Sequence, residues 1–205
     1  MIRATPGRIL LIGAFATVAS TASVARPEES PALRLVRAAR EQVGVTVVYD
    51  GSYRALAYPG GDVPPERGVC TDVVVRAYRA LGFDLQRAVH EDMRAAWSAY
   101  PKLWGLDGPD RNIDHRRVPN LATFLRRRGA ELRLADDPAA FRPGDLVTWR
   151  LPSGVPHIGI VSDRRIDERP LILHNIGAGA REEDVIFVYE RTGHFRFVPP
   201  APVRD

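Results

Sequence analysis

The stretch Gly68-Val69-Cys70-Thr71-Asp72-Val73-Val74 places the only cysteine of the chain at the start of a predicted helix. Apolar side chains recur after Cys70 at helical spacing, and Gly82 supplies a typical helix stop: Val73, Val74, Ala77, Tyr78 and Leu81. A thiol at a helix start faces unpaired N–H groups and the positive end of the helix dipole, which favour the thiolate and can hold an oxyanion. The same position also suits a small buried hydrophobic residue. This helix alone therefore leaves two interpretations open, a nucleophile and a core residue.

The 205-residue chain begins with the pattern of an export signal. Arg3 and Arg8 precede an apolar run at residues 9–18, and the small residues at 21–25 are typical of a signal-peptidase site. The apolar run is too short for a comfortable membrane anchor, and no cysteine near the site offers a lipid attachment. We expect a signal peptide at residues 1–25 and a single domain at residues 26–205. The mature protein should be periplasmic or secreted, with no stable membrane anchor.

Export makes the lone cysteine informative. Oxidising compartments favour disulfides, but Cys70 has no partner within the chain. An exposed free thiol is a liability there unless it is used, so export favours a functional Cys70, although a fully buried cysteine would escape this reasoning.

The charge balance does not favour nucleic acid as a partner. The formal net charge is +4, and loss of Arg3 and Arg8 from the 29 basic residues leaves 27 against 25 acidic residues. Such a weak field does not predict a polyanionic partner.

Helical patterns come first along the chain, and strand patterns follow. We predict helices at about residues 30–43, 70–81, 85–100 and 120–128. A short β-like run at residues 45–49 and strands at residues 146–149, 157–162, 171–175, 185–189 and 194–198 are also predicted. This order favours an α+β fold in which N-terminal helices pack on a C-terminal antiparallel sheet.

Two loops carry polar residues of interest. The polar stretch at residues 105–119 could form an Arg-lined pocket for an anionic group or an ordinary loop with surface ion pairs; it contains Asn112, Asp114, His115, Arg116 and Arg117. The turn Arg142-Pro143-Gly144-Asp145 precedes a strand, and we expect Asp145 to serve that turn and not the chemistry.

A cysteine nucleophile needs a base and a third group that orients the base. The strand region offers His157, followed by the neighbours His174 and Asn175. On its strand His157 shares a face with Gly159, which would leave room for an opposing helix end that carries the thiol. A single histidine on a strand is more often structural, so the interpretation depends on His157 together with an exported lone cysteine.

These motifs resemble the NlpC-type cysteine peptidases of bacterial cell walls, which have a papain-like fold. The resemblance rests on Cys70 at a helix start, on Pro143-Gly144-Asp145-Leu146-Val147, on His157-Ile158-Gly159-Ile160-Val161 and on Ile172-Leu173-His174-Asn175; Gly60-Gly61 also resembles the upstream loop of that family. It implies that Cys70 is the nucleophile, His157 the base and His174 the orienting residue, with Asn175 as a competitor for the third role.

The exported part also resembles the YijF-like bacterial family catalogued as a domain of unknown function. Four stretches carry this resemblance: 58–62, 67–72, 112–120 and 174–179. Within them we expect five substrate-binding residues: Tyr58, Asp72, His115, Arg116 and Asn175. Val69 stands where the NlpC pattern usually has Asp, and Thr71-Asp72 where it has Ser-Gly. The departures flank the nucleophile, so they place the substrate in doubt more than the reaction class.

The resemblance implies an exported cysteine hydrolase that cleaves an amide bond in peptidoglycan or another cell-envelope peptide through an acyl-enzyme on Cys70, without a cofactor. An alternative is a non-catalytic envelope protein that binds a peptide or glycan on the same scaffold. A third hypothesis is a metal hydrolase that uses His157, His174 and either Cys70 or Asp145. It is weaker, because the chain lacks a paired ligand spacing such as H-x-x-x-H.

Overall fold

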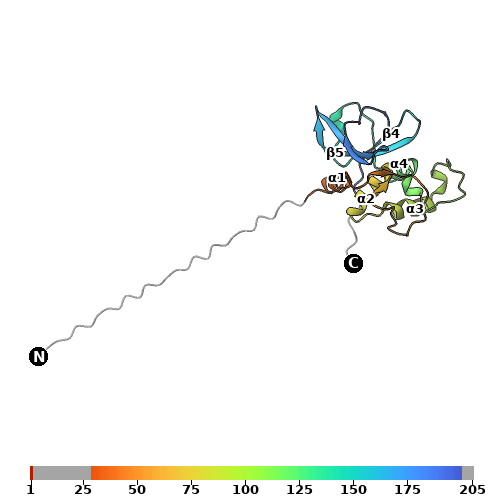
Figure 1. Ribbon diagram of the computed structural model, residues 1–205, viewed down its shortest axis with the longest axis horizontal. Helices are drawn as coiled ribbons and strands as arrows, with labels where there is room; N and C mark the ends of the chain where they lie inside the picture. The colour runs from red at the N-terminus through yellow and green to blue at the C-terminus, as the bar shows by residue number, and fades with distance from the viewer. Residues whose placement is uncertain (2–28, 200–205) are drawn as a thin grey trace.

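Four helices form the first part of the fold (Figure 1). The computed structural model describes Met1 and residues 29–199, so the predicted signal peptide lies, apart from Met1, outside the described residues. The helices are α1 (Pro31–Arg40), α2 (Cys70–Ala80), α3 (Leu85–Ala95) and α4 (Val118–Arg127). The Ser30 hydroxyl accepts the N–H of Leu33 at the start of α1, and the Asp84 carboxylate accepts the N–H of Gln86 at the start of α3.

Two helices are shorter than their apolar patterns predict. The chain leaves α1 at Arg40 and turns through residues 41–45. It leaves α3 at Ala95, and η1 (Trp97–Ala99) follows as a short 3₁₀ helix. Tyr100 is still buried, and its hydroxyl donates to Asp92 at 2.6 Å. The apolar periodicity therefore continues to Tyr100, which is buried although the helix has already ended at Ala95.

The second half of the chain forms a six-stranded sheet. Its strands are β3 (Glu131–Leu132), β4 (Leu146–Arg150), β5 (Pro156–Ile166), β6 (Arg169–Asn175), β7 (Ala180–Glu183) and β8 (Glu190–Phe195). They lie in the order β3-β8-β4-β5-β6-β7, and every neighbouring pair is antiparallel. The remaining elements are a two-stranded parallel pair, β1 (Val48–Tyr49) with β2 (Arg67–Gly68), and the 3₁₀ helices η2 (Asp114–Arg116) and η3 (Pro138–Ala140). The predicted α+β arrangement is confirmed.

The two faces of the sheet bury different sets of side chains. Ile158, Ile160 and Leu173 pack with the helices in the larger core. Their neighbours Val161 and Ile172 alternate onto the other face, where a second cluster also contains Phe141, Val147, Trp149 and Ile186. The site residues on β5 and β6 therefore belong to strands that are covered on both sides.

The predicted strand at residues 185–189 is wrong. The chain turns there, with the N–H of Val188 bonded to the carbonyl of Val185. Ile186 instead covers the second face of the sheet, where its carbonyl accepts the Trp149 indole N–H at 3.2 Å. Ile186 is the buried residue of this run, whereas Val188 is exposed, so the run covers the sheet from outside instead of joining it.

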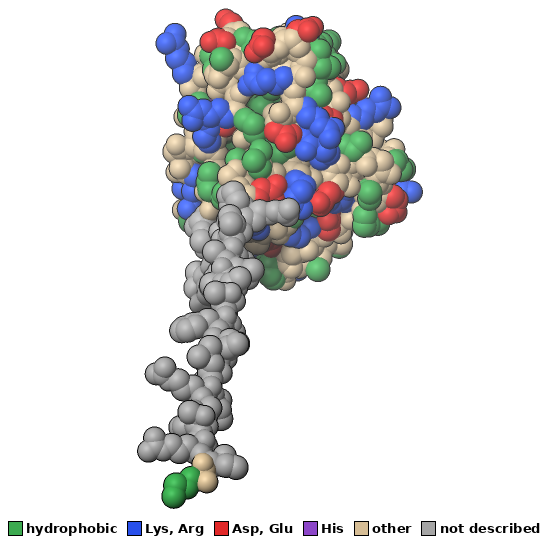
Figure 2. Space-filling model, turned by 90° about the vertical axis from the view of Figure 1, so that its left-hand side faces the viewer, with side chains coloured by type: hydrophobic (Ala, Val, Ile, Leu, Met, Phe, Trp, Pro, Cys, Tyr) green, Lys and Arg blue, Asp and Glu red, His purple; other side chains and the backbone are tan. Residues whose placement is uncertain are grey.

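The surface and the helices give two further facts. On the face shown in Figure 2, Lys and Arg side chains lie among Asp and Glu side chains, and no single sign of charge covers it. No helix within residues 29–199 has the length and apolar character needed to cross a bilayer.

Candidate active site

Cys70 is the first residue of α2, as predicted, and it is 4% exposed. The Asp72 carboxylate accepts the N–H of Val69 at 2.7 Å, which satisfies one of the free donors at the helix start. The backbone N–H groups of Ile158, Thr71 and Cys70 itself face the sulfur. The thiol therefore lies between the start of α2 and the peptide that follows His157 in β5.

Burial raises the pKa of the Cys70 thiol to about 12, and the Asp72 charge adds to the increase. The N–H groups around the sulfur act in the opposite direction but do not compensate. The predicted depression of this pKa is therefore wrong for the substrate-free protein, because removal of a charge from water outweighs a helix start.

Three buried or half-buried side chains from β5, β6 and β7 form a hydrogen-bonded chain. His157 Nε2 lies 2.8 Å from His174 Nδ1, and His174 Nε2 lies 3.0 Å from Glu183 Oε2. An ionised carboxylate only accepts, so His174 carries its proton on Nε2 and accepts at Nδ1. His157 must then donate from Nε2, which leaves its Nδ1 as the nitrogen with a free lone pair. We call these three residues the histidine relay.

Both histidines of the relay are neutral in this environment. Burial lowers the pKa of His157 to about 3, and His174 adds to the decrease. Burial also lowers the pKa of His174, against the opposing effect of Glu183. No hydrogen bond joins Cys70 to either histidine among residues 29–199. The predicted Cys70–His157 ion pair is therefore not formed here, because neither group is charged.

The expected reason for Gly159 is also wrong. A Cβ at this position would lie 2.5 Å from Ile172 Cγ2 and 3.1 Å from His174 Cβ, so β6 and not the helix occupies the space. The helices pack instead on the face of Ile158 and Ile160. The missing side chain allows β5 and β6 to approach closely enough for the two histidines to meet.

The structure brings His174, and not Asn175, within hydrogen-bond distance of His157. Asn175 is buried and donates to the carbonyl of Gly68 at 3.0 Å, while its Oδ1 accepts the N–H of Gly177 at 3.1 Å. Asn175 therefore ties the end of β6 to the segment that leads into Cys70. The distance between His157 and His174 confirms the predicted contact, and their catalytic roles remain a prediction.

Glu183 was missed by the sequence reasoning. It lies among the charged residues Arg181, Glu182, Glu183 and Asp184, where nothing distinguishes one carboxylate from another. The β6–β7 register pairs His174 with Arg181 and Ile172 with Glu183, which brings the Glu183 side chain to His174. Only the pairing of the strands selects it.

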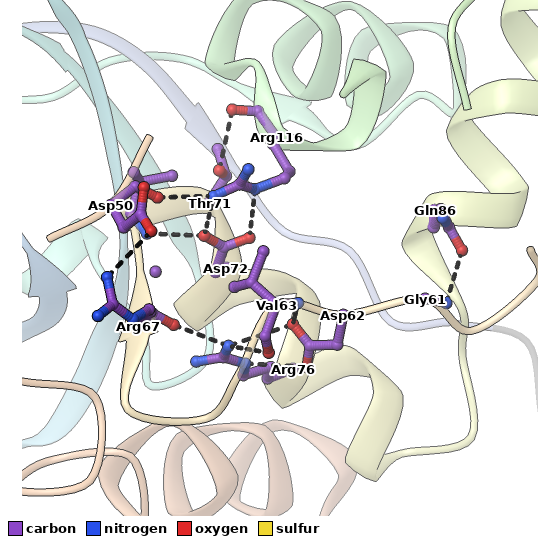
Figure 3. Close-up of polar contacts among 12 residues, drawn as sticks. Asp50, Gly61, Asp62, Val63, Arg67, Thr71, Asp72, Arg76, Gln86 and Arg116 are labelled. Atoms are coloured by element: carbon purple, nitrogen blue, oxygen red, sulfur yellow. Dashed lines mark hydrogen bonds and ion pairs between the residues drawn. The ribbon is translucent and has the colours of Figure 1, made fainter. Parts of the chain in front are cut away.

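Asp72 and Arg116, both predicted to bind substrate, bind each other (Figure 3). Arg116 Nε lies 2.9 Å from Asp72 Oδ1 and Nη2 lies 3.0 Å from Oδ2, with the side chains 2% and 3% exposed. The same guanidinium donates to the carbonyls of Asp50 and Ser52, and the Thr71 hydroxyl donates to the carbonyl of Arg116. These contacts give Asp72 and Arg116 a structural role at the start of α2.

Tyr58 and His115 do not lie with the thiol. The Tyr58 ring packs edge-on against His90, 5.3 Å between ring centroids. His115 is buried, its Nδ1 has no hydrogen-bond partner among the described residues, and burial lowers its pKa to about 3. Neither residue lines the pocket beside Cys70.

A pocket of about 200 Å³ opens beside Cys70. Its walls are largely apolar and include Tyr49, Cys70, Trp104, Arg116, Arg117 and Pro156. The sequence does not predict Tyr49 or Trp104 as site residues, and it predicts Arg117 only as part of the polar stretch at residues 105–119. The pocket gives a route from solvent to the residue that carries the thiol.

The structure places Asp145 away from this site. Its carboxylate accepts the N–H of Arg142 at 2.9 Å in the predicted turn, and it pairs with His194 at 2.7 Å and Arg196 at 2.7 Å. The turn role of Asp145 is confirmed. Within residues 29–199 no three His, Cys, Asp or Glu side chains are grouped as a metal site.

Comparison with known proteins gives three findings. A family model described as "Domain of unknown function (DUF1287)" matches residues 36–197. The "Uncharacterized protein YijF" of Escherichia coli (strain K12) is 52% identical over 166 residues, which cover 80% of this chain and 81% of YijF. The "Structure of NlpC1 from Trichomonas vaginalis" is similar with a TM-score of 0.43 and 14% identity, over 83% of this chain and 46% of that one. The chain thus spans about half the length of that solved structure.

Proposed function

This chain belongs to the DUF1287 family, and we propose that it is an exported cysteine hydrolase that cleaves an amide bond in cell-wall peptides. The reaction proceeds through an acyl-enzyme on Cys70. His157 is the base, and His174 and Glu183 hold the base in position.

In the proposed reaction the Cys70 thiol and both histidines of the relay start out neutral, so a proton must leave the thiol as it attacks. The substrate carbonyl enters the pocket, and His157 Nδ1 takes the thiol proton as the sulfur attacks the carbonyl carbon. N–H groups at the start of α2 stabilise the oxyanion. The imidazolium then gives its proton to the leaving amine, and a thioester remains on Cys70. Water, activated by His157, attacks the thioester and releases the acid and the free thiol.

The histidine relay is the observation that carries this proposal. It fixes the tautomer that leaves His157 Nδ1 free to accept a proton, and it begins at the residue whose following N–H faces the Cys70 sulfur. When His157 becomes charged, its Nε2–H donates to His174, and the Glu183 carboxylate stabilises the charge through the second histidine. Catalytic hydrogen bonds are often long before substrate binds, so the missing thiol–imidazole bond is compatible with this role.

A non-catalytic envelope protein that binds a peptide or glycan in the pocket is the second candidate. The raised pKa of Cys70 and the absence, among the described residues, of a bond from Cys70 to His157 favour it. The two candidates differ in one respect, because only the hydrolase must activate the thiol when a carbonyl substrate is bound.

The test is to incubate the protein with peptidoglycan digests and to identify new products by mass. Cys70→Ser and His157→Ala should abolish product formation. Since both side chains are buried, circular dichroism should show that both variants fold. If wild-type protein binds the digest without cleaving it, the hydrolase proposal fails and the binding protein takes its place.

A further inference from the structure

Of the two guanidinium groups that line the Cys70 pocket, that of Arg117 donates no hydrogen bond to any described residue. Arg116 also lines the pocket, but its N–H groups donate to Asp72 and to two backbone carbonyls. The Arg117 guanidinium makes no hydrogen bond to any residue within 29–199. Its Cζ lies over the Trp104 ring, 4.0 Å from the centroid, and both residues line the pocket.

The charge of Arg117 is compensated by one carboxylate, which does not reach hydrogen-bond distance. The nearest carboxylate oxygen is Asp114 Oδ1 at 3.8 Å, beyond hydrogen-bond distance, and that oxygen has no hydrogen-bond partner among the described residues. Burial raises the pKa of Asp114 to about 6, so this carboxyl is still mostly ionised at neutral pH, and burial lowers the pKa of Arg117. No Asp or Glu is among the described residues that line the pocket. A bound carboxylate would therefore accept hydrogen bonds from N–H groups that no acceptor among the described residues takes, beside an Asp114 that neutralises the cation only in part.

We propose that Arg117 binds a carboxylate of the substrate, so that the protein acts on peptide amides that carry a free carboxylate close to the scissile bond. This substrate class rests on the proposed hydrolase function. The planar guanidinium suits a two-pronged contact with a carboxylate, and Trp104 holds it in orientation. Because Arg117 and Cys70 line the same small pocket, the carboxylate and the scissile carbonyl lie within one residue's reach of each other.

The carboxylate site can be tested without any hydrolysis. Iodoacetate and iodoacetamide both alkylate a thiolate at the same carbon and release iodide, but only iodoacetate carries a carboxylate. Cys70 is the only thiol, so intact mass gives both rates directly. We expect the iodoacetate-to-iodoacetamide rate ratio to fall about tenfold in Arg117→Gln, because a charge-assisted hydrogen bond is lost.

Two further variants control this experiment. Arg117→Lys keeps the charge without the fork and should retain an intermediate ratio. Arg87→Gln removes an exposed charge on α3, away from the pocket, and should match wild type. Equal ratios in wild type and Arg117→Gln, with both folded by circular dichroism, would overturn the proposal. Complete resistance of folded wild type to iodoacetate would also overturn it, because the pocket would then not admit a carboxylate to the sulfur.

A second arm tests the substrate class. Wild type should cleave a peptidoglycan digest faster than the same digest after its carboxylates are converted to carboxamides, and Arg117→Gln should remove the preference. Equal cleavage of both digests by wild type would overturn the assigned substrate class. A shifted alkylation ratio without cleavage of either digest would defeat the hydrolase and leave the carboxylate site supported.

Discussion

At the scale of single residues, the state of the Cys70 thiol depends on two opposing effects of known size. A helix start stabilises an anion by about 0.3–1 kcal/mol, and by about 2 kcal/mol in favourable sites, which corresponds to roughly one pKa unit. Burial shifts a pKa by up to about 3–5 units. The pKa of about 12 is consistent with this difference, and it means that the thiol is neutral in the substrate-free protein.

This protonation state predicts the pH dependence of alkylation. The rate of Cys70 modification by iodoacetamide should rise about tenfold per pH unit between roughly pH 6 and pH 9, because only the thiolate reacts. A free cysteine derivative should level off above its pKa of about 8.5 under the same conditions. A rate for Cys70 that is already constant below about pH 7 would show a preformed ion pair and contradict the neutral state.

A second prediction concerns Glu183. Glu183→Gln keeps an acceptor for the His174 N–H but loses the charge, whereas Glu183→Leu loses both. We expect kcat to fall about tenfold in the first variant and further in the second, because the charge-assisted bond between His174 and Glu183 is lost. KM should change little, since Glu183 does not line the pocket. Steady-state kinetics on a purified muropeptide would measure both constants.

The control for Glu183 is Glu190→Gln, which changes an exposed carboxylate on β8. An equal loss of kcat in both variants, or a change confined to KM, would contradict a positioning role for Glu183.

At the scale of elements, the start of α2 depends on the buried pair of Asp72 and Arg116. Removing one partner of such a pair leaves an uncompensated buried charge, which costs about 3–5 kcal/mol. We therefore expect Asp72→Asn to lower the free energy of unfolding by several kcal/mol in urea titrations.

The matched double variant Asp72→Asn with Arg116→Met separates pairing from packing. It should be less destabilised than the sum of the two single variants, because no unpaired charge remains. Additive losses would indicate that the two side chains act independently.

The turn before β4 gives a prediction about acid stability. Burial works to raise the pKa of Asp145, but hydrogen bonds from His194, Arg196 and the Arg142 N–H outweigh it and hold that pKa below its usual range. A depressed carboxyl pKa stabilises the fold above the unfolded pKa of about 3.9 and loses this effect as pH falls through the folded pKa. The unfolding free energies of wild type and Asp145→Asn should therefore differ more at neutral pH than at about pH 3. A constant difference would contradict this role.

At the scale of the whole molecule, the prediction is export followed by cleavage. Arg3, Arg8 and the apolar run at residues 9–18 fit a signal, and α1 begins at Pro31, after the expected cleavage point. N-terminal sequencing of protein released from cells should find a chain that starts near residue 26. An intact Met1 on the released protein would disprove it.

Local patterns in the sequence were enough to predict much of the fold. The helix that starts at Cys70, the strands that carry His157 and His174, and the turn at Asp145 all follow from the spacing of apolar residues and from turn residues close together in the chain. Such features depend on neighbours within one turn or one strand, so a linear sequence contains them.

Only the tertiary structure decided the remaining features of the site. Strand register selected Glu183 from four adjacent charged residues, and the β5–β6 approach gave Gly159 its role. Burial reversed the expected pKa of Cys70, and the folded chain paired Asp72 with Arg116 while the Arg117 guanidinium donates no hydrogen bond among the described residues. Each outcome depends on desolvation or on contacts between residues far apart in the chain, and these quantities exist only once the helices and the sheet have packed together.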